Sequence, residues 1–159
     1  MNIPQVLAIS LHTVALVIAW GYYGILGRIA LPALERSLDH QALATTLLAM
    51  ERRAVPLVAL SALLFTLSGS YLLVIDPHYA GLGNVFASTW TLLMLVRHGM
   101  VIAFIALAVA VDRLIRRVAR TTDTGPRQRD LRWLGFTAEG ATGLGALIVL
   151  LTAAAQVVA

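Results

Sequence analysis

Four long apolar segments dominate the chain, and most polar residues lie in the stretches between them. The segments cover about residues 4–28, 54–76, 86–111 and 133–157. Each is long enough for an α-helix to cross the hydrocarbon core of a bilayer, which takes about 20 residues. A spanning segment must satisfy its own backbone hydrogen bonds, so all four are predicted to be helices. The pattern therefore predicts a single all-α domain, an integral membrane antiparallel four-helix bundle.

The arginine residues predict how this bundle is oriented. All of them except Arg97 lie in the connection between the first two segments or in the arginine-rich loop 113–132, whereas the N-terminus and the connection 76–83 contain none. The positive-inside rule places arginine-bearing connections in the cytoplasm, so the N-terminus and the C-terminus are predicted to be outside. We expect a multi-pass protein of the cell inner (cytoplasmic) membrane. Contact of loop 113–132 with anionic lipid or with a partner protein stays open.

The connection between the first two segments is also predicted to be helical. Asp39 has a side chain typical of a helix N-cap and divides the connection into two pieces. We therefore expect the first two helices to project past the membrane and to turn near Asp39. Apolar positions recur at helical spacing in both pieces, at Leu31, Leu34 and Leu38 and again at Leu43, Leu47 and Met50.

The composition agrees with a membrane protein and excludes several other classes. Hydrophobic residues make up 59% of the chain and charged residues 13%, against about a quarter charged in soluble domains. The chain has no cysteine, which excludes disulfides, thiolate metal ligands and thiol catalysis. The net charge of +4 lies mainly in the connections, where topology explains it, so we predict no nucleic-acid partner.

Four ionisable residues inside the predicted spans are the candidate functional residues: His12, Arg97, His98 and Glu139. Such residues are costly in hydrocarbon and usually functional. At 1.5 Å per residue, His12 lies about 12 Å and His98 about 18 Å from the outer surface. Antiparallel neighbouring helices can present both imidazoles to one cavity, which is a common way to hold haem. We predict haem b with His12 and His98 as its iron ligands, and a hydrogen bond to a neighbouring helix remains the alternative for each histidine.

Arg97 and Glu139 have two interpretations. Their predicted depths are similar, about 16 Å and 18 Å from the outer surface, so they are candidates for a buried ion pair. In the other interpretation, Arg97 faces a haem propionate and Glu139 lies near a path for protons or substrate. Arg97 and His98 point about 100° apart around their helix, so they can border one cavity without sharing a role.

Copper is the alternative to haem. Met94 precedes His98 by four residues and shares its helix face. Together with His12 they form a set of two histidines and a methionine, which suits copper, although a single methionine on an apolar helix usually serves packing. The small residues of the fourth segment, such as Ala141 and Gly145, admit close approach of a cofactor or of another helix.

Several short stretches resemble the copper-resistance-D (CopD) superfamily of small membrane proteins. They are Leu11-His12, Ala19-Trp20-Gly21, Glu51-Arg52-Arg53, Ser68-Gly69-Ser70-Tyr71-Leu72, Trp90 with Arg97-His98, and Glu139-Gly140. Met50-Glu51-Arg52-Arg53 is also similar to the stretch before the second helix of the haem-containing protoporphyrinogen oxidases (HemJ). The resemblance implies a four-helix bundle associated with haem or copper, with His12 and His98 at the cofactor.

The expected function is that of a b-type haem protein of the membrane, an electron-transfer subunit that forms a homo-oligomer or belongs to a larger membrane complex. The alternatives are a copper transport or binding protein of the CopD type, a structural subunit without cofactor, and a porphyrinogen oxidase. Whether the chain is an enzyme stays open, although an association with an oxidoreductase is expected.

Overall fold

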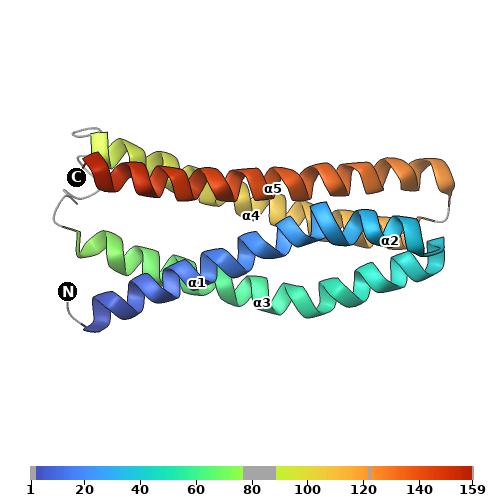
Figure 1. The fold of residues 1–159 in the computed structure, drawn as a ribbon, viewed down its shortest axis with the longest axis horizontal. Coiled ribbons are helices and arrows are strands. Elements are labelled where there is room, and N and C mark those ends of the chain that lie inside the picture. Colours follow the sequence, from blue (N-terminus) through green and yellow to red (C-terminus); the bar gives the residue numbers. More distant parts are fainter. Residues whose placement is uncertain (1–2, 77–88, 122, 159) are drawn as a thin grey trace.

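The computed structural model describes residues 3–76, 89–121 and 123–158. All regular secondary structure in these ranges is helical (Figure 1). Four of the helical stretches are long and apolar enough to cross a membrane, which confirms the predicted all-α four-helix membrane bundle. The elements are α1 (Ile3–Ile25), the π-helix η1 (Leu26–Ala30), α2 (Leu31–Ser37), α3 (His40–Val74), α4 (Thr89–Arg120) and α5 (Thr124–Val158).

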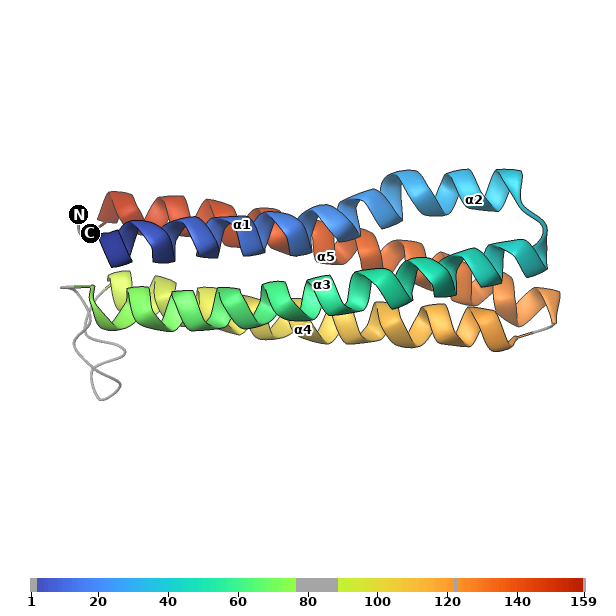
Figure 2. The ribbon, with the colours of Figure 1, turned by 90° about the horizontal axis from the view of Figure 1, so that it is seen from below.

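The long helices surround one axis in the order α1, α3, α4, α5. Figures 1 and 2 show α1 beside α3 and α4 beside α5, with both chain ends at the same end of the bundle. We call this the termini end, and we call the opposite end, whose half of the bundle carries every arginine except Arg97, the arginine end. The exposed surface of the helices is rich in leucine, isoleucine and valine, which suits a lipid environment.

α1 continues through η1 into α2 and projects toward the arginine end. Pro32 lacks an N–H group for the carbonyl of Arg28, and the helix widens just before it, because the N–H of Leu31 donates to the carbonyl of Leu26. The turn near Asp39 is confirmed: its carboxylate accepts hydrogen bonds at 2.9 Å from the backbone N–H groups of Gln41 and Ala42 and so caps α3.

One helix start differs from the sequence prediction, and another falls outside the described residues. α5 begins at Thr124, well before the expected start near Trp133, because Pro126 is compatible with the first turn of a helix and therefore does not interrupt it. α4 begins within the described residues at Thr89. The expected start of this span at residue 86 lies outside the described residues.

The best-packed core lies toward the arginine end. Leu47, Ile115, Val118 and Leu134 are at most 1% exposed there. Helices of 32 to 35 residues are about 48 to 52 Å long and exceed the roughly 30 Å of the hydrocarbon core. The bundle therefore extends beyond the hydrocarbon core. The charged residues gather at the arginine end, which indicates that this is the end that extends into water.

One close approach between α1 and α5 uses a small residue. The indole of Trp20 occupies the space in which a side chain at Gly145 would lie, and its Nε1–H donates to the carbonyl of Thr142 at 2.7 Å. At this position, therefore, the small residue admits a neighbouring helix's side chain.

Candidate functional site: a buried histidine–arginine pair beside an apolar cavity

His12 lies on the inward face of α1, together with the buried residues Ala8, Ala15 and Ala19. Its ring stacks on Phe65 of α3 with ring centroids 3.9 Å apart. A Cβ atom at Gly69 of α3 would approach the Cε1 atom of His12 to 2.9 Å. Gly69 therefore provides the space in which the imidazole sits.

The hydrogen bonds of His12 assign the roles of both ring nitrogens. Nε2 lies 2.7 Å from Nη2 of Arg97, and a guanidinium only donates, so Nε2 must accept. Nδ1 then carries the hydrogen and donates at 3.1 Å to the carbonyl of Phe65. It also lies 3.1 Å from Oγ of Ser68, whose own hydroxyl donates to the carbonyl of Leu64 at 2.6 Å. His12 is therefore neutral in this arrangement.

Arg97 is a cation without a carboxylate partner among the described residues. Among the described residues, its guanidinium forms hydrogen bonds to Nε2 of His12 and, at 3.9 Å, to the sulfur of Met94. Arg97 lies eight residues inside α4, about 12 Å from the start of this helix at Thr89. A charged side chain near the bilayer centre costs about 2.5–3.5 kcal/mol on insertion scales. Such a charge is expected to have a functional reason.

The structure does not bring His98 and His12 to one cavity, so the predicted pair is not formed. His98 is exposed, and its Nδ1 lies 2.6 Å from the carbonyl of Met94 in its own helix. The inward face of α4 follows a seven-residue spacing through Trp90, Arg97 and Phe104. His98 is rotated from this face by about 100°.

The predicted ion pair between Arg97 and Glu139 is also not formed. Glu139 is exposed, and its backbone nitrogen lies next to Gly27. Gly27 follows His12 by 15 residues, which is about 22 Å along a helix. The equal-depth estimate is wrong because apolar length does not tell where along α5 the bilayer begins.

Neither predicted metal site is assembled in this arrangement. The described residues contain no group of three or more His, Asp or Glu side chains able to hold a metal ion. The cation of Arg97 occupies the space beside Nε2 of His12 and the sulfur of Met94. As placed, these residues therefore do not fit haem held by His12 and His98, nor copper held with Met94. Both assignments stay predictions.

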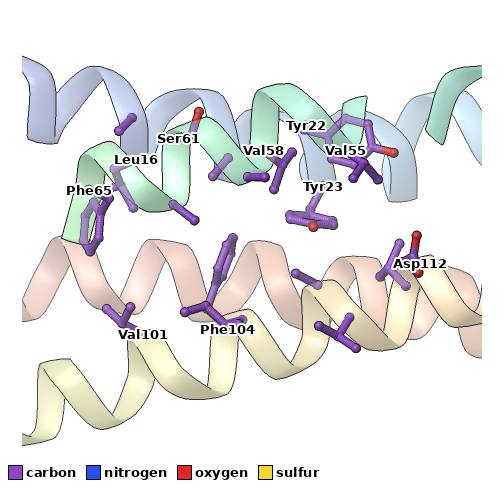
Figure 3. Close-up of a pocket in the computed structure, with 18 of the residues that line it drawn as sticks. Leu16, Tyr22, Tyr23, Val55, Val58, Ser61, Phe65, Val101, Phe104 and Asp112 are labelled. Atoms are coloured by element: carbon purple, nitrogen blue, oxygen red, sulfur yellow. The ribbon is translucent and has the colours of Figure 1, made fainter. Parts of the chain in front are cut away.

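A cavity of about 430 Å³ lies between α1, α3 and α4, next to the His12 site. Figure 3 shows Phe65 of α3, Phe104 of α4 and Tyr23 of α1 pointing into this space. Val55 of α3 and Ile105 of α4 also line it, and both are exposed at the molecular surface. The cavity therefore opens sideways between α3 and α4, toward the surroundings of the helices.

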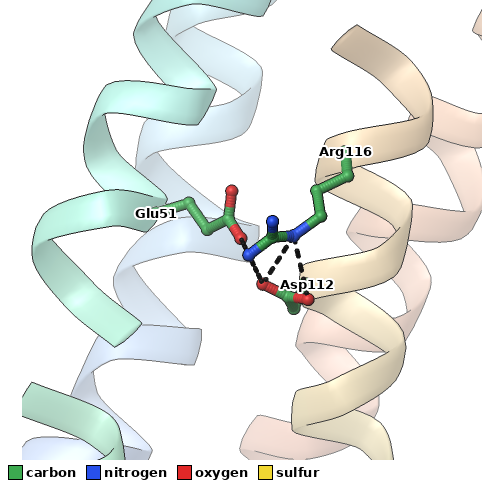
Figure 4. Close-up of polar contacts among 3 residues, drawn as sticks. All are labelled: Glu51, Asp112 and Arg116. Atoms are coloured by element: carbon green, nitrogen blue, oxygen red, sulfur yellow. Dashed lines mark hydrogen bonds and ion pairs between the residues drawn. The ribbon is translucent and has the colours of Figure 1, made fainter. Parts of the chain in front are cut away.

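A charged cluster closes the cavity toward the arginine end (Figure 4). The guanidinium of Arg116 lies 2.8 Å from Oε1 of Glu51 and donates to both carboxylate oxygens of Asp112 at 3.0 to 3.2 Å. Glu51 is buried, with 3% of its surface exposed.

This cluster was not predicted from the sequence as a site. A signal was present, because Glu51 continues the apolar four-residue spacing of Leu43 and Leu47. An acid on the buried face of a helix implies a partner, and here Arg116 supplies it.

Comparison of the chain with protein-family models, with curated proteins and with solved structures found no match.

Proposed function

We propose that this protein binds a lipophilic ligand, which enters the cavity sideways from the bilayer between α3 and α4. The observation that carries the proposal is the cavity itself, because it is lined mainly by apolar side chains and reaches the surface between two membrane helices. Its volume of about 430 Å³ falls within the usual range of small-molecule sites. The positive-inside rule favours the inner membrane with the arginine end in the cytoplasm.

The polar groups at the cavity would orient such a ligand. Tyr23 lines the cavity and carries a hydroxyl group. This hydroxyl can donate a hydrogen bond to a ligand that has an acceptor. The ligand class is therefore an apolar molecule that carries polar groups.

Filling the cavity tests this proposal. Ala108 of α4 lines the cavity, whereas Ala103 of the same helix is exposed and does not. We expect Ala108→Phe to weaken the binding of a lipophilic fluorophore to the purified protein severalfold, with Ala103→Phe as the matched control. Gel filtration shows whether each variant is folded. Equal binding by folded Ala108→Phe and by the control would refute the cavity as the site.

Haem binding, with a role in electron transfer, is the second candidate function. One observation favours it: Nδ1 of His12 donates to a backbone carbonyl, as it commonly does in metal-binding histidines. Arg97, which donates to Nε2 in this arrangement, would have to move for Nε2 to bind iron. A reduced-minus-oxidised absorbance spectrum of the purified protein tests it. A sharp Soret shift that His12→Ala abolishes would support haem. A featureless spectrum would contradict it, and metal analysis of the same sample then tests copper.

A further inference from the structure

We propose that Arg97, which is held in place by His12, binds the oxyanion of the cavity's ligand, so that the ligand is a lipophilic acid with its carboxylate or phosphate toward the termini end. This inference rests on the proposed ligand cavity, because the apolar part of the acid would occupy it. The juxtaposition that carries it is a half-buried guanidinium beside a neutral imidazole, one helical turn from the end of an apolar cavity.

Arg97 has both the charge and the free donors that such an anion requires. A guanidinium has five N–H donors and remains protonated in proteins. Among the described residues, two contacts engage it, one with Nε2 of His12 and one with the sulfur of Met94. Neither partner carries a negative charge in this arrangement. The remaining donors match a bidentate carboxylate or phosphate, for which arginine is well suited.

The site and the cavity are continuous through Phe65. The Phe65 ring stacks on His12 on one side and lines the cavity on the other. Ala15 of α1 and Val101 of α4 also line the cavity, one turn further along their helices than His12 and Arg97. A ligand whose acid group binds Arg97 can therefore extend its apolar chain directly into the cavity.

The opposite end of the cavity disfavours an anion, which sets the direction of the ligand. Two carboxylates, Glu51 and Asp112, share the single guanidinium of Arg116 there. With both carboxylates ionised the cluster has a net charge of −1, and with one of them protonated it is neutral. In neither state does the cluster offer an unpaired cation to an acid inside the cavity, as Arg97 does at the other end.

A comparison of palmitic acid with palmityl alcohol tests the inference, because the two share one chain and differ in the charged group. Binding of each radiolabelled compound is measured with the protein in nanodiscs of neutral phosphatidylcholine. We expect the acid to bind about ten- to a hundredfold more tightly than the alcohol, as charged hydrogen bonds require. Arg97→Gln should bring the affinity for the acid down to about that for the alcohol, whereas Arg97→Lys should retain part of the difference.

The control variant is Arg120→Gln, which removes an exposed arginine of the same helix and should leave the difference intact. Equal binding of acid and alcohol by the wild type would overturn the inference and leave the cavity proposal standing. Binding of neither compound would overturn both. Displacement of palmitate by inorganic phosphate or acetate at equal concentration would overturn the claim that the ligand is lipophilic. The site would then bind small free anions equally well. Gel filtration and thermal unfolding show whether Arg97→Gln is folded.

Discussion

Replacement of Gly69 by alanine is the sharpest test of how His12 is held. In an open position of a helix, Gly→Ala stabilises by about 1 kcal/mol. At Gly69, the added Cβ atom would lie 2.9 Å from Cε1 and 3.4 Å from Nδ1 of His12. The Phe65 ring is stacked against the imidazole, so the ring cannot shift freely. We expect Gly69→Ala to displace His12 and to destabilise the protein.

The size of the effect follows from the hydrogen bonds at stake. Nδ1 of His12 donates to the carbonyl of Phe65 and Nε2 accepts from Arg97, and each such bond contributes about 1 kcal/mol. Loss of both costs about 2 kcal/mol, which exceeds the gain in helix propensity and leaves a net loss of about 1 kcal/mol.

Gly99→Ala in α4 is the matched control, because an added Cβ atom there meets nothing within 4 Å. It should stabilise by about 1 kcal/mol, so the two variants should differ by about 2 kcal/mol. For a chain of this size that is about 4–8 °C in Tm, measured by thermal unfolding in detergent. A Gly69→Ala protein as stable as Gly99→Ala would refute the described approach of α1 and α3.

Three further predictions concern the caps and contacts of the bundle. Asp39→Ala should destabilise by about 1 kcal/mol, and hydrogen exchange should be faster at the amides that Asp39 caps. Gly145→Ala should displace the indole of Trp20, since the added Cβ atom would lie 2.5 Å from its Cδ1 atom, and a change in tryptophan fluorescence would report it; unchanged emission would contradict this contact. Arg116→Gln should lower the thermal stability more than Arg120→Gln does, because it leaves two carboxylates beside each other. This loss should shrink as the pH falls and the carboxylates bind protons.

The helices and the turn near Asp39 could be predicted from the sequence because local patterns determine them. Uninterrupted apolar length predicts a spanning helix in any bundle. An aspartate before a helical pattern caps the helix through contacts with its own neighbours in the chain. Neither feature depends on which helices are adjacent.

The candidate site could be predicted only in part, because it depends on how the helices are rotated. The similar depth of His12 and the Arg97–His98 pair agrees with the contact between His12 and Arg97. The sequence did not predict that Arg97, and not His98, contacts His12, since adjacent residues differ by about 100° in direction. The seven-residue spacing of Trp90, Arg97 and Phe104 marks the face of α4 that points into the bundle, and Arg97 lies on this face.

The cavity and the cluster of Glu51 could not be predicted in this way. A cavity forms where side chains of three helices fail to fill the space between them, and no single segment encodes that volume. In the sequence, Arg116 is one of several arginines of loop 113–132, all of which the positive-inside rule explains equally well. Only its position opposite Glu51 and Asp112 distinguishes it.

The helices are much longer than the bilayer is thick, so the two halves of this bundle are held together by different forces. Around the core at the arginine end, burial from water drives association. Within the lipid, the surroundings are as apolar as the helices, and association depends on contacts such as those of Trp20 and His12. A denaturant confined to water, such as urea, should therefore loosen the arginine end while the membrane-embedded half, with its cavity, stays associated. Detergents of different chain length should act mainly on the embedded half.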